Sequence, residues 1–325
     1  MRAMVIKQYG GTDQLSIEEI PLPEPKKGEI LIRVRAFGIN RAETYMRRGL
    51  WGDVAKVSGI ECVGEVEDDP SGRLATGQKV AAIMGGMGRS RNGSYAEFTC
   101  SPATNVFPLE TAMAWADLAA IPESYATAWC CLHENMKLKH GDTVLVRGGT
   151  SALGQAAINI AANMHGVTVI ASTRNKDNIA LLKAVGSAEV LIDGEGLSGR
   201  LKEIYPEGID SVLDIVGNTT LRDSLKMVKK GGYVCNAGFL GGGDPILFNP
   251  LMDLPPSVNL NFFASFMFGT NDFPTSSIPM QVMVDNAFKG RYKAKPVKVF
   301  DFAEIAAAHE LMESNGAHGK IVVRV

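Results

Sequence analysis

The sequence predicts an α/β protein in which a doubly wound parallel sheet is joined to a second, β-rich domain. The chain has 325 residues, of which 46% are apolar, so it can bury two ordinary cores. Short β-like runs separated by turn signals fill the first 120 residues or so. From about Pro122, helical and strand patterns alternate, as in βαβ units. This change of rhythm predicts two domains of different architecture.

The β-rich part contains five strand candidates and one short helix. Turn signals of Gly, Pro, Asp and Asn separate them, which predicts an irregular, mostly antiparallel domain. The helix candidate, RAETYMRRG, ends at Gly49. The strand candidates are 3–10, 30–40, 62–68, 79–84 and 94–100.

The second part alternates strictly, and its strands are almost continuously apolar, as expected where helices cover both faces of a parallel sheet. The predicted strands are 142–148, 167–173, 188–193, 210–217 and 233–239. The predicted helices are 122–136, 151–166, 176–186, 197–205 and 219–232.

Three further elements are expected after a Gly/Pro loop at 240–256. A strand candidate, VNLNFFASFMFG at 258–269, is apolar enough to mark a subunit interface equally well. A helix is expected at 278–291, and the last strand of the chain should return to the first domain.

Charge and composition argue against nucleic acid and membrane partners. The 33 basic and 35 acidic residues nearly cancel, giving a net charge of -2. The N-terminal residues lack the apolar core of a signal peptide, and no apolar run approaches the roughly 20 residues of a membrane span. We therefore expect a cytoplasmic or organelle-matrix protein.

The cysteines predict reduced thiols and no metal site. There are five, an odd number, and none forms a CxxC pair. Cys130, Cys131 and His133 cluster in one helix candidate, but zinc needs three or four converging ligands, so a packed helix is the preferred interpretation.

The turn GGTSALG follows the strand candidate DTVLV and opens a helix. Strict G-x-G-x-x-G spacing from Gly149 gives Gly149, Ser151 and Gly154, so one glycine is missing. Small residues still allow close backbone approach, and a helix N-terminus favours a pyrophosphate. We expect Ser151, Ala152 and Leu153 to bind it; an ordinary βα turn is the alternative.

The next strand end, STRNK, bears on the choice of cofactor. NAD-binding domains place an acid about 20 residues past the glycine loop, and none stands here. Thr173, Arg174 and Lys176, with the hydroxyl of Ser172, suit the dianionic 2′-phosphate of NADPH. The alternative is a solvated helix start.

These features, together with the motif GINRAETYMRRG at 38–49, resemble the medium-chain dehydrogenase/reductase superfamily. Within it the chain is most similar to the zinc-independent quinone oxidoreductase group, which includes zeta-crystallin, over nearly its whole length. The resemblance implies a GroES-like catalytic domain at 1–121 and 291–325, a Rossmann domain at 122–290, and an active site in the cleft between them.

The zinc ligands of related alcohol dehydrogenases are missing. Asn40 stands where those enzymes have a Cys, and Ile60 where they have a His. The cysteine-rich loop for structural zinc is also replaced, by 85–98. Without a Lewis acid, nothing stabilises the alkoxide that alcohol oxidation requires. The expected reaction is hydride transfer from NADPH to a quinone or an α,β-unsaturated carbonyl.

The resemblance also implies catalytic and substrate residues. Asn40 and Thr127 should face the nicotinamide, and Tyr45 should line the substrate pocket as a hydrogen-bond donor. Trp51 stands where related enoyl reductases have a tyrosine that donates a proton, and an indole cannot take that role. The substitution argues against a fatty enoyl reductase and favours a flat wall on which a planar substrate stacks. The alternatives are a turn role for Asn40, a backbone hydrogen bond for Thr127 and a core cap for Trp51.

Two later strand ends complete the expected cofactor site. The resemblance places Val216, Gly217, Gly238, Phe239 and Leu240 along the ribose and nicotinamide, with Phe266 in the same wall. One departure matters, because the relatives have a tyrosine near the adenosine phosphate where this chain has Asp193. An acid pointing toward that phosphate would be unfavourable.

Two further expectations follow from the resemblance. The first is a homodimer formed through the edge strand of the Rossmann sheet. The second is an alternative function: a non-catalytic NADPH-binding redox sensor or crystallin-like protein would bind the cofactor without turning over an acceptor.

Overall fold

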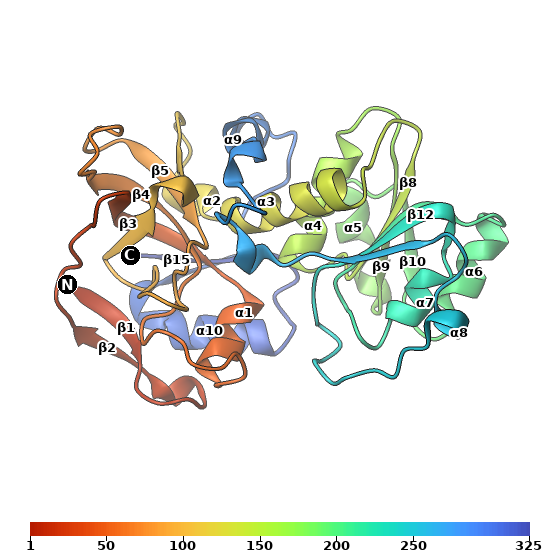
Figure 1. The fold of residues 1–325 in the computed structure, drawn as a ribbon, viewed down its shortest axis with the longest axis horizontal. Helices are drawn as coiled ribbons and strands as arrows, with labels where there is room; N and C mark the ends of the chain where they lie inside the picture. Colours follow the sequence, from red (N-terminus) through yellow and green to blue (C-terminus); the bar gives the residue numbers. More distant parts are fainter. The chain divides into compact units, whose positions relative to one another are not determined.

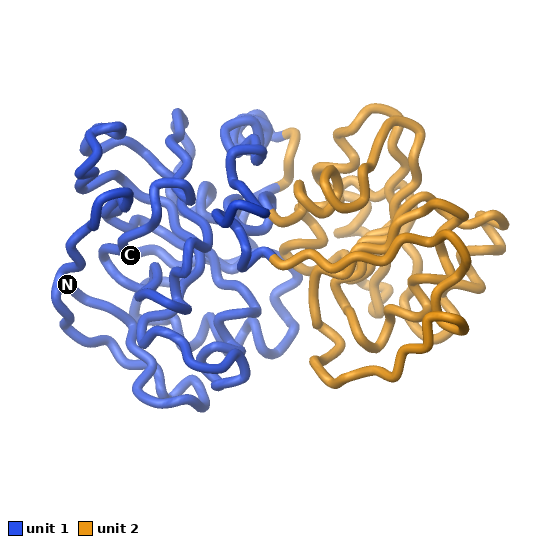
Figure 2. The backbone as a smooth tube through the Cα atoms, in the orientation of Figure 1, with its two compact units in different colours: residues 1–126, 265–290, 294–325 blue, residues 127–264, 291–293 orange.

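The structure, a computed structural model, describes residues 1–325, which form two compact units (Figure 2). The first contains 1–126, 265–290 and 294–325, and the second contains 127–264 and 291–293. The segment 265–290 thus packs with the first unit, whereas the expected division at 122–290 would count it with the second. The sequence-based limits remain a prediction about the functional domains. Judged by their length and apolar content, none of the helices could span a membrane.

The first unit is built on a seven-stranded, mostly antiparallel sheet (Figure 1). The strand order is β14-β15-β3-β4-β5-β7, with β6 also paired to β3, and β1 and β2 form a separate hairpin. The strands are β1 (Arg2–Ile6), β2 (Leu15–Glu19), β3 (Glu29–Ile39), β4 (Glu61–Asp68), β5 (Lys79–Ile83), β6 (Phe98–Pro102), β7 (Val106–Pro108), β14 (Lys298–Asp301) and β15 (Ile321–Arg324).

Four helices accompany this sheet, and one apolar core fills the unit. Residues from β1, β3, β4, β5, α10 and β15 share that core. The last strand, β15, pairs antiparallel with β3, so the return of the chain end to the first unit is confirmed. The helices are α1 (Arg41–Arg47), α2 (Trp115–Leu118), α9 (Met280–Phe288) and α10 (Ile305–Glu313).

The second unit is a six-stranded parallel sheet in the order β10-β9-β8-β11-β12-β13. The order reverses beside β8, and such a switch point is where ligands bind in open α/β sheets. The strands are β8 (Thr143–Arg147), β9 (Thr168–Thr173), β10 (Glu189–Ile192), β11 (Ile209–Asp214), β12 (Val228–Asn236) and β13 (Asn259–Phe262). The predicted α/β class with a doubly wound sheet is confirmed.

The helices of this unit follow the strands and pack in pairs, α4 with α5 and α6 with α7. Right-handed crossovers on either side of β8 place the two pairs on opposite faces of the sheet. These helices are α4 (Ala152–Ala162), α5 (Ile179–Val185), α6 (Leu197–Ile204), α7 (Leu221–Leu225) and α8 (Pro250–Asp253). A further helix, α3 (Pro122–Cys130), contains the boundary between the units and continues as a π-helical turn, Cys131–Asn135.

Two predicted elements were too long. The helix expected at 219–232 ends at Leu225, because Val228 already pairs with Ile209 of β11. The strand expected at 258–269 is limited to β13, and Ser265–Met267 forms a 3-10 turn. At 226–232 a helix-like run continued into glycines, and at 258–269 an apolar run left the period undecided; pairing with a neighbouring strand set the observed limits.

Candidate functional site

The turn between β8 and α4 has the geometry of an anion cradle. Ser151 is the N-cap of α4, and its Oγ accepts a hydrogen bond from the Gly154 N–H at 3.0 Å. The N–H groups of Ala152 and Leu153 make no hydrogen bond within the protein. Unpaired donors at the start of an eleven-residue helix are what a pyrophosphate requires. The missing central glycine therefore does not disable the turn.

Gly154 lets the start of α4 approach the loop closely, although Ser151 stands where the central glycine of the motif would be. A Cβ on Gly154 would lie 2.5 Å from the Gly148 oxygen and 2.8 Å from the Gly149 Cα. The helix start thus touches the loop backbone directly, and the close approach depends on Gly154. Ser151 adds a hydrogen bond from its Oγ to the Gly148 oxygen at 2.9 Å.

The structure brings the turns after β11 and β12 together beside this loop. The Gly241 N–H donates to the Val216 oxygen at 2.8 Å, and the Leu240 N–H donates to the Ile215 oxygen at 3.2 Å. A Cβ on Gly217 would lie within 2.4 Å of the Gly238 oxygen, so only glycine fits there. Four of the expected cofactor residues, Val216, Gly217, Gly238 and Leu240, are therefore neighbours within the second unit.

Two aromatic residues expected in the same wall lie in different surroundings. Phe239 packs against Phe262 of β13, with ring centroids 5.8 Å apart. Phe266 lies in the first unit, where its ring meets Trp51 edge to face at 6.1 Å. The Arg89 guanidinium lies over both rings, 4.8 Å from the centroid of Phe266 and 5.9 Å from that of Trp51. Trp51 is thus half of an aromatic pair with a cation above it.

The segment after β9 offers two unpaired cations. Arg174 and Lys176 are exposed and form no ion pair. The Thr173 hydroxyl donates to the Asn175 oxygen at 3.3 Å and holds the turn. Ser172 is fully buried and donates to Asp193 at 2.8 Å, so its hydroxyl does not face the segment's exposed cations.

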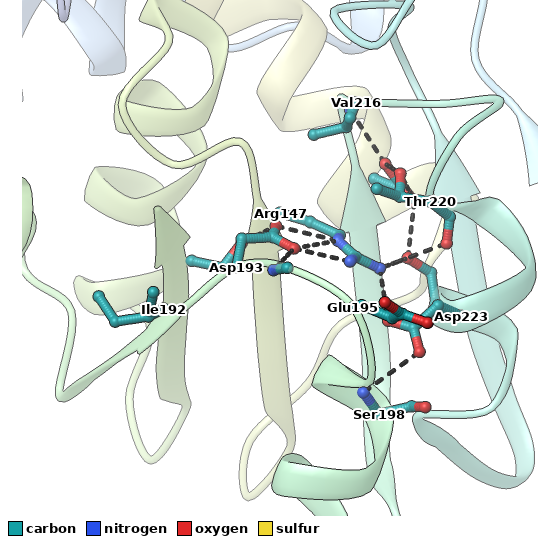
Figure 3. Close-up of polar contacts among 12 residues, drawn as sticks. Arg147, Ile192, Asp193, Glu195, Ser198, Val216, Thr220 and Asp223 are labelled. Carbon is teal, nitrogen blue, oxygen red and sulfur yellow. Dashed lines mark hydrogen bonds and ion pairs between the residues drawn. The ribbon is translucent and has the colours of Figure 1, made fainter. Parts of the chain in front are cut away.

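Arg147, the last residue of β8, connects the ends of β8, β10 and β11 with helix α7 (Figure 3). Its guanidinium binds Asp193 after β10 and Asp223 of α7, at 2.7 and 2.9 Å. It also donates to Ser224 at 3.1 Å, which in turn donates to Asp214 of β11 at 2.6 Å. Asp214 accepts from the N–H groups of Val216 and Gly217, both at 2.9 Å, and so fixes the turn after β11.

In the first unit, both ends of the Asn40 amide are held by a buried ion pair. Lys320 of the chain end and Glu61 of β4 lie 2.5 Å apart. Lys320 donates to the Asn40 Oδ1 at 2.7 Å, and the Asn40 Nδ2 donates to Glu61 at 2.9 Å. Lys320 also donates to Ser124 at 3.3 Å. A Cβ on Gly38 would collide with Lys320 and Glu61, which explains the glycine two residues before Asn40.

A second buried carboxylate fixes the backbone around Asn40. Glu43 of α1 accepts from the Asn40 N–H at 2.6 Å and from the Ile60 N–H at 3.0 Å. Its remaining partner is the Tyr95 hydroxyl at 3.0 Å, which also contacts the Nε2 of His309 at 2.9 Å. Burial raises the pKa of Glu43 to about 7. Burial and the neighbouring Arg47 lower the pKa of His309 to about 3.

Tyr45 and Thr127, the other two residues expected at the reaction centre, lie on helices. Tyr45 is half-buried on α1, five residues after Asn40. Thr127 is buried in α3, and it belongs to the second unit. Their roles toward a nicotinamide stay predictions.

The residues that stand in place of the zinc ligands have other surroundings. Ile60 is buried and has no ligand atom, and the Asn40 oxygen already accepts from an ammonium group. His133 stacks on Trp129 at 3.6 Å and its Nδ1 contacts the Trp129 oxygen, while Cys130 and Cys131 are buried. Nowhere do three His, Cys, Asp or Glu side chains come together as metal ligands.

Sequence reasoning missed three residues that the structure makes central: Glu61, Lys320 and Arg147. Each is a charged residue at the start or end of a strongly apolar strand, in ECVG, KIVV and LVRG. A charge in that position is rarely buried unless it is paired, so the pattern was a usable signal that a partner existed. It did not say which partner.

Comparison with known proteins agrees with both units. Residues 26–111 match the family model described as alcohol dehydrogenase GroES-like domain, and residues 152–281 match zinc-binding dehydrogenase. The quinone oxidoreductase of Lama guanicoe is 27% identical, with 99% of this chain and 97% of that protein covered. The human quinone oxidoreductase is also 27% identical with the same coverage.

Two solved structures share the whole fold. A mycobacterial protein in complex with NADPH is 26% identical, covers both chains completely and has a TM-score of 0.88. The Escherichia coli quinone oxidoreductase in complex with NADPH has a TM-score of 0.86 over both complete chains, but its 21% identity supports the fold alone. The chain belongs to the medium-chain dehydrogenases/reductases. Within them it is a member of the quinone oxidoreductase group, and it is an oxidoreductase.

Proposed function

We propose that this protein is an NADPH-dependent reductase that transfers hydride to a quinone or to an α,β-unsaturated carbonyl without a catalytic zinc. The observation that carries the proposal is the environment of Asn40. Its oxygen accepts from the Lys320 ammonium at 2.7 Å, and the neighbouring position that would hold a histidine ligand is the buried Ile60. A fixed cation occupies the Asn40 oxygen that a metal would need.

A mechanism without a Lewis acid restricts the range of acceptors. Oxidation of an alcohol needs a group that stabilises an alkoxide, such as a bound zinc ion. Asn40 and Ile60, which stand at the positions of the zinc ligands, do not provide the ligand atoms to hold one. Quinones and enones already carry an electrophilic carbon, so positioning and exclusion of water suffice for hydride transfer. The edge-to-face pair of Trp51 and Phe266 offers an aromatic surface of the kind that a planar acceptor stacks on.

The second unit carries the residues that would hold NADPH, which supplies the hydride when bound. The free N–H groups of Ala152 and Leu153 would bind the pyrophosphate, and the exposed Arg174 and Lys176 would bind the 2′-phosphate. The turns at Val216 and Gly238 would follow the ribose and nicotinamide. The known NADPH complex of a relative with 26% identity and the same fold supports this choice of cofactor.

The decisive experiment measures NADPH oxidation with a panel of quinones and enones after NADPH binding has been shown by fluorescence. We expect acceptor-dependent oxidation that survives chelator treatment, from protein without stoichiometric zinc. Binding of NADPH without turnover of any acceptor would instead identify a non-catalytic sensor or crystallin-like protein. Activity that depends on stoichiometric zinc would refute the zinc-free mechanism.

Substitutions assign the roles. Asn40→Ala should lower kcat by about tenfold or more while NADPH binding is retained, because it disturbs position rather than affinity. Tyr45→Phe should raise the KM of the acceptor if its hydroxyl orients the substrate carbonyl. Tyr205→Phe, which removes a half-buried hydroxyl at the end of α6 that bonds Glu189, is the matched control and should change neither constant.

A further inference from the structure

Asp193 lies directly beside the segment proposed to bind the 2′-phosphate. Ile192 pairs with Thr173 in the register of β10 and β9, and the Asp193 N–H donates to the Thr173 oxygen at 2.8 Å. Arg174 is the next residue along the chain. A free carboxylate at this place would repel a dianionic phosphate and would favour the cofactor that lacks it.

The Asp193 carboxylate is not free. Arg147 binds it through two guanidinium nitrogens, with Nε at 3.0 Å from one oxygen and Nη2 at 2.7 Å from the other. The Ser172 hydroxyl and the Gly194 N–H each add a hydrogen bond at 2.8 Å. The side chain is only 9% exposed. Its acceptor positions are filled and its charge is compensated.

Arg147 is itself held in place from the other side. Its Nη1 donates to Asp223 at 2.9 Å, to Ser224 at 3.1 Å and to the Thr220 oxygen at 3.3 Å. The side chain is 3% exposed, and Figure 3 shows it between Asp193 and Asp223. A guanidinium fixed by α7 in this way cannot swing away to bind the cofactor, so its effect on a phosphate must act through Asp193.

We propose that Arg147 is a specificity-determining residue that secures the preference for NADPH over NADH by masking Asp193. The inference rests on the proposed place of the 2′-phosphate at Thr173, Arg174 and Lys176. Arg147 acts as a positioning residue: it turns the Asp193 carboxylate away from that phosphate and cancels its charge. Asp193 then stabilises the end of β10 and does not discriminate between the ribose hydroxyl of NADH and the 2′-phosphate of NADPH.

The test compares dissociation constants for NADPH and NADH, measured by cofactor fluorescence with the intact protein and no acceptor. Arg147→Met should lower the NADPH preference by about tenfold or more, the order expected for one unit charge near a dianion at an effective dielectric constant of about 20. The double variant R147M/D193N should restore the preference, because the unmasked charge is gone. Arg222→Met removes an exposed cation from α7 and serves as the control, with the preference unchanged.

Asp193→Asn alone gives a second test that does not depend on whether Arg147→Met folds. In this variant Arg147 remains paired with Asp223 at 2.9 Å, so the guanidinium stays compensated and the preference should stay within about twofold of wild type. A tenfold gain in NADPH preference would overturn the inference. An equal loss of affinity for both cofactors in Arg147→Met, or no recovery in the double variant, would also overturn it.

These outcomes are separable from failure of the proposed function. Binding is measured without an acceptor, so lack of turnover does not affect them. If Arg174→Ala and Lys176→Ala leave the NADPH preference unchanged, the phosphate lies elsewhere and the proposed cofactor site is wrong. If they remove it while Arg147→Met does not, only the role of Arg147 fails.

Discussion

The ion pair of Glu61 and Lys320 illustrates how burial changes the contribution of an ion pair to stability. Its side chains are 0% and 5% exposed, whereas Lys229 and Asp210 form an ion pair of the same 2.5 Å length with Lys229 48% exposed. Removing one partner of a buried pair leaves an uncompensated charge, while water replaces the lost partner at the surface.

We therefore expect Lys320→Met to destabilise the protein by about 3 to 5 kcal/mol and Lys229→Met by at most about 1 kcal/mol. The free energy of unfolding in urea checks both values. The double variant K320M/E61Q should recover much of the loss, because neither charge of the pair then remains. Equal effects of the two lysine substitutions would contradict the argument.

At the same scale, the sequence identified Asn40 and Ile60 as departures from a zinc site but not the cation beside them. Lys320 is 259 positions from Glu61 and 280 from Asn40. No local pattern links such positions, so the pair follows from the docking of β15 against β3.

At the scale of elements, α1 and α10 are joined by a buried titratable chain. Glu43 of α1 and His309 of α10 both contact the Tyr95 hydroxyl, and Arg47 of α1 contacts His309 at 3.3 Å. The pKa of Glu43 is raised to about 7, so the native state binds a proton that the unfolded state releases above about pH 4.5. The pKa of His309 is lowered to about 3, so between pH 6.5 and 3 the unfolded state binds the proton instead.

The two groups have opposite effects on stability as the pH falls from 6.5 to 4.5. Protonation of Glu43 favours the native state and protonation of His309 favours the unfolded state. Relative to wild type, His309→Gln should gain stability with falling pH in this window and Glu43→Gln should lose it, each by at most about 1.4 kcal/mol per pH unit. Urea unfolding at several pH values measures both slopes. Parallel curves for wild type and both variants would show that neither group titrates as described.

The start of α4 gives a second prediction for an element. In Gly154→Ala the new Cβ would meet loop backbone at 2.5 and 2.8 Å, which must push the helix away from the loop. We expect a stability loss of about 2 kcal/mol or more, together with weaker NADPH binding.

Gly199→Ala is the matched control for that substitution. Gly199 lies within α6, and its added Cβ would meet nothing within 4 Å. There the change should stabilise by about 0.5 to 1 kcal/mol with unchanged cofactor affinity. Thermal unfolding and fluorescence titration compare the two. Tolerance of alanine at Gly154 would show that the close approach is not needed.

Elements with strong periodicity and clear punctuation were predicted well, as the succession of β8, α4 and β9 shows. Errors arose where local signals conflicted. At 226–232 a helix-like run continues into glycines, and the competing strand pairing with β11 prevailed. Composition cannot weigh such pairing, because the partner strand lies elsewhere in the sequence.

At the scale of the whole molecule, β13 presents an unpaired edge with apolar side chains. It is the last strand of its sheet, and Leu260 and Phe262 are exposed by 37% and 50%. An exposed apolar edge is an aggregation hazard unless it is covered. We propose that a second copy of this chain covers it and that the protein is a homodimer.

Sedimentation velocity tests this proposal. The wild type should sediment as a dimer, and Leu260→Lys should shift it toward the monomer, because a buried edge does not tolerate an unpaired charge. Ile204→Lys, at an exposed apolar position of α6, is the control and should leave the dimer intact. A monomeric wild type would refute the proposal.

The class of fold, the turn of small residues after β8 and the missing zinc ligands could all be identified from the amino-acid sequence. These depend on residue spacing within one strand, turn or helix start, and the physics that governs them is local. The pairing of Arg147 with Asp193, the hydrogen bond from Lys320 to Asn40 and the packing of Phe266 with Trp51 became evident only from the folded chain. Each of these joins residues from separate strands and loops, and the energy of a buried charge or ring depends on which partner the folded chain brings to it.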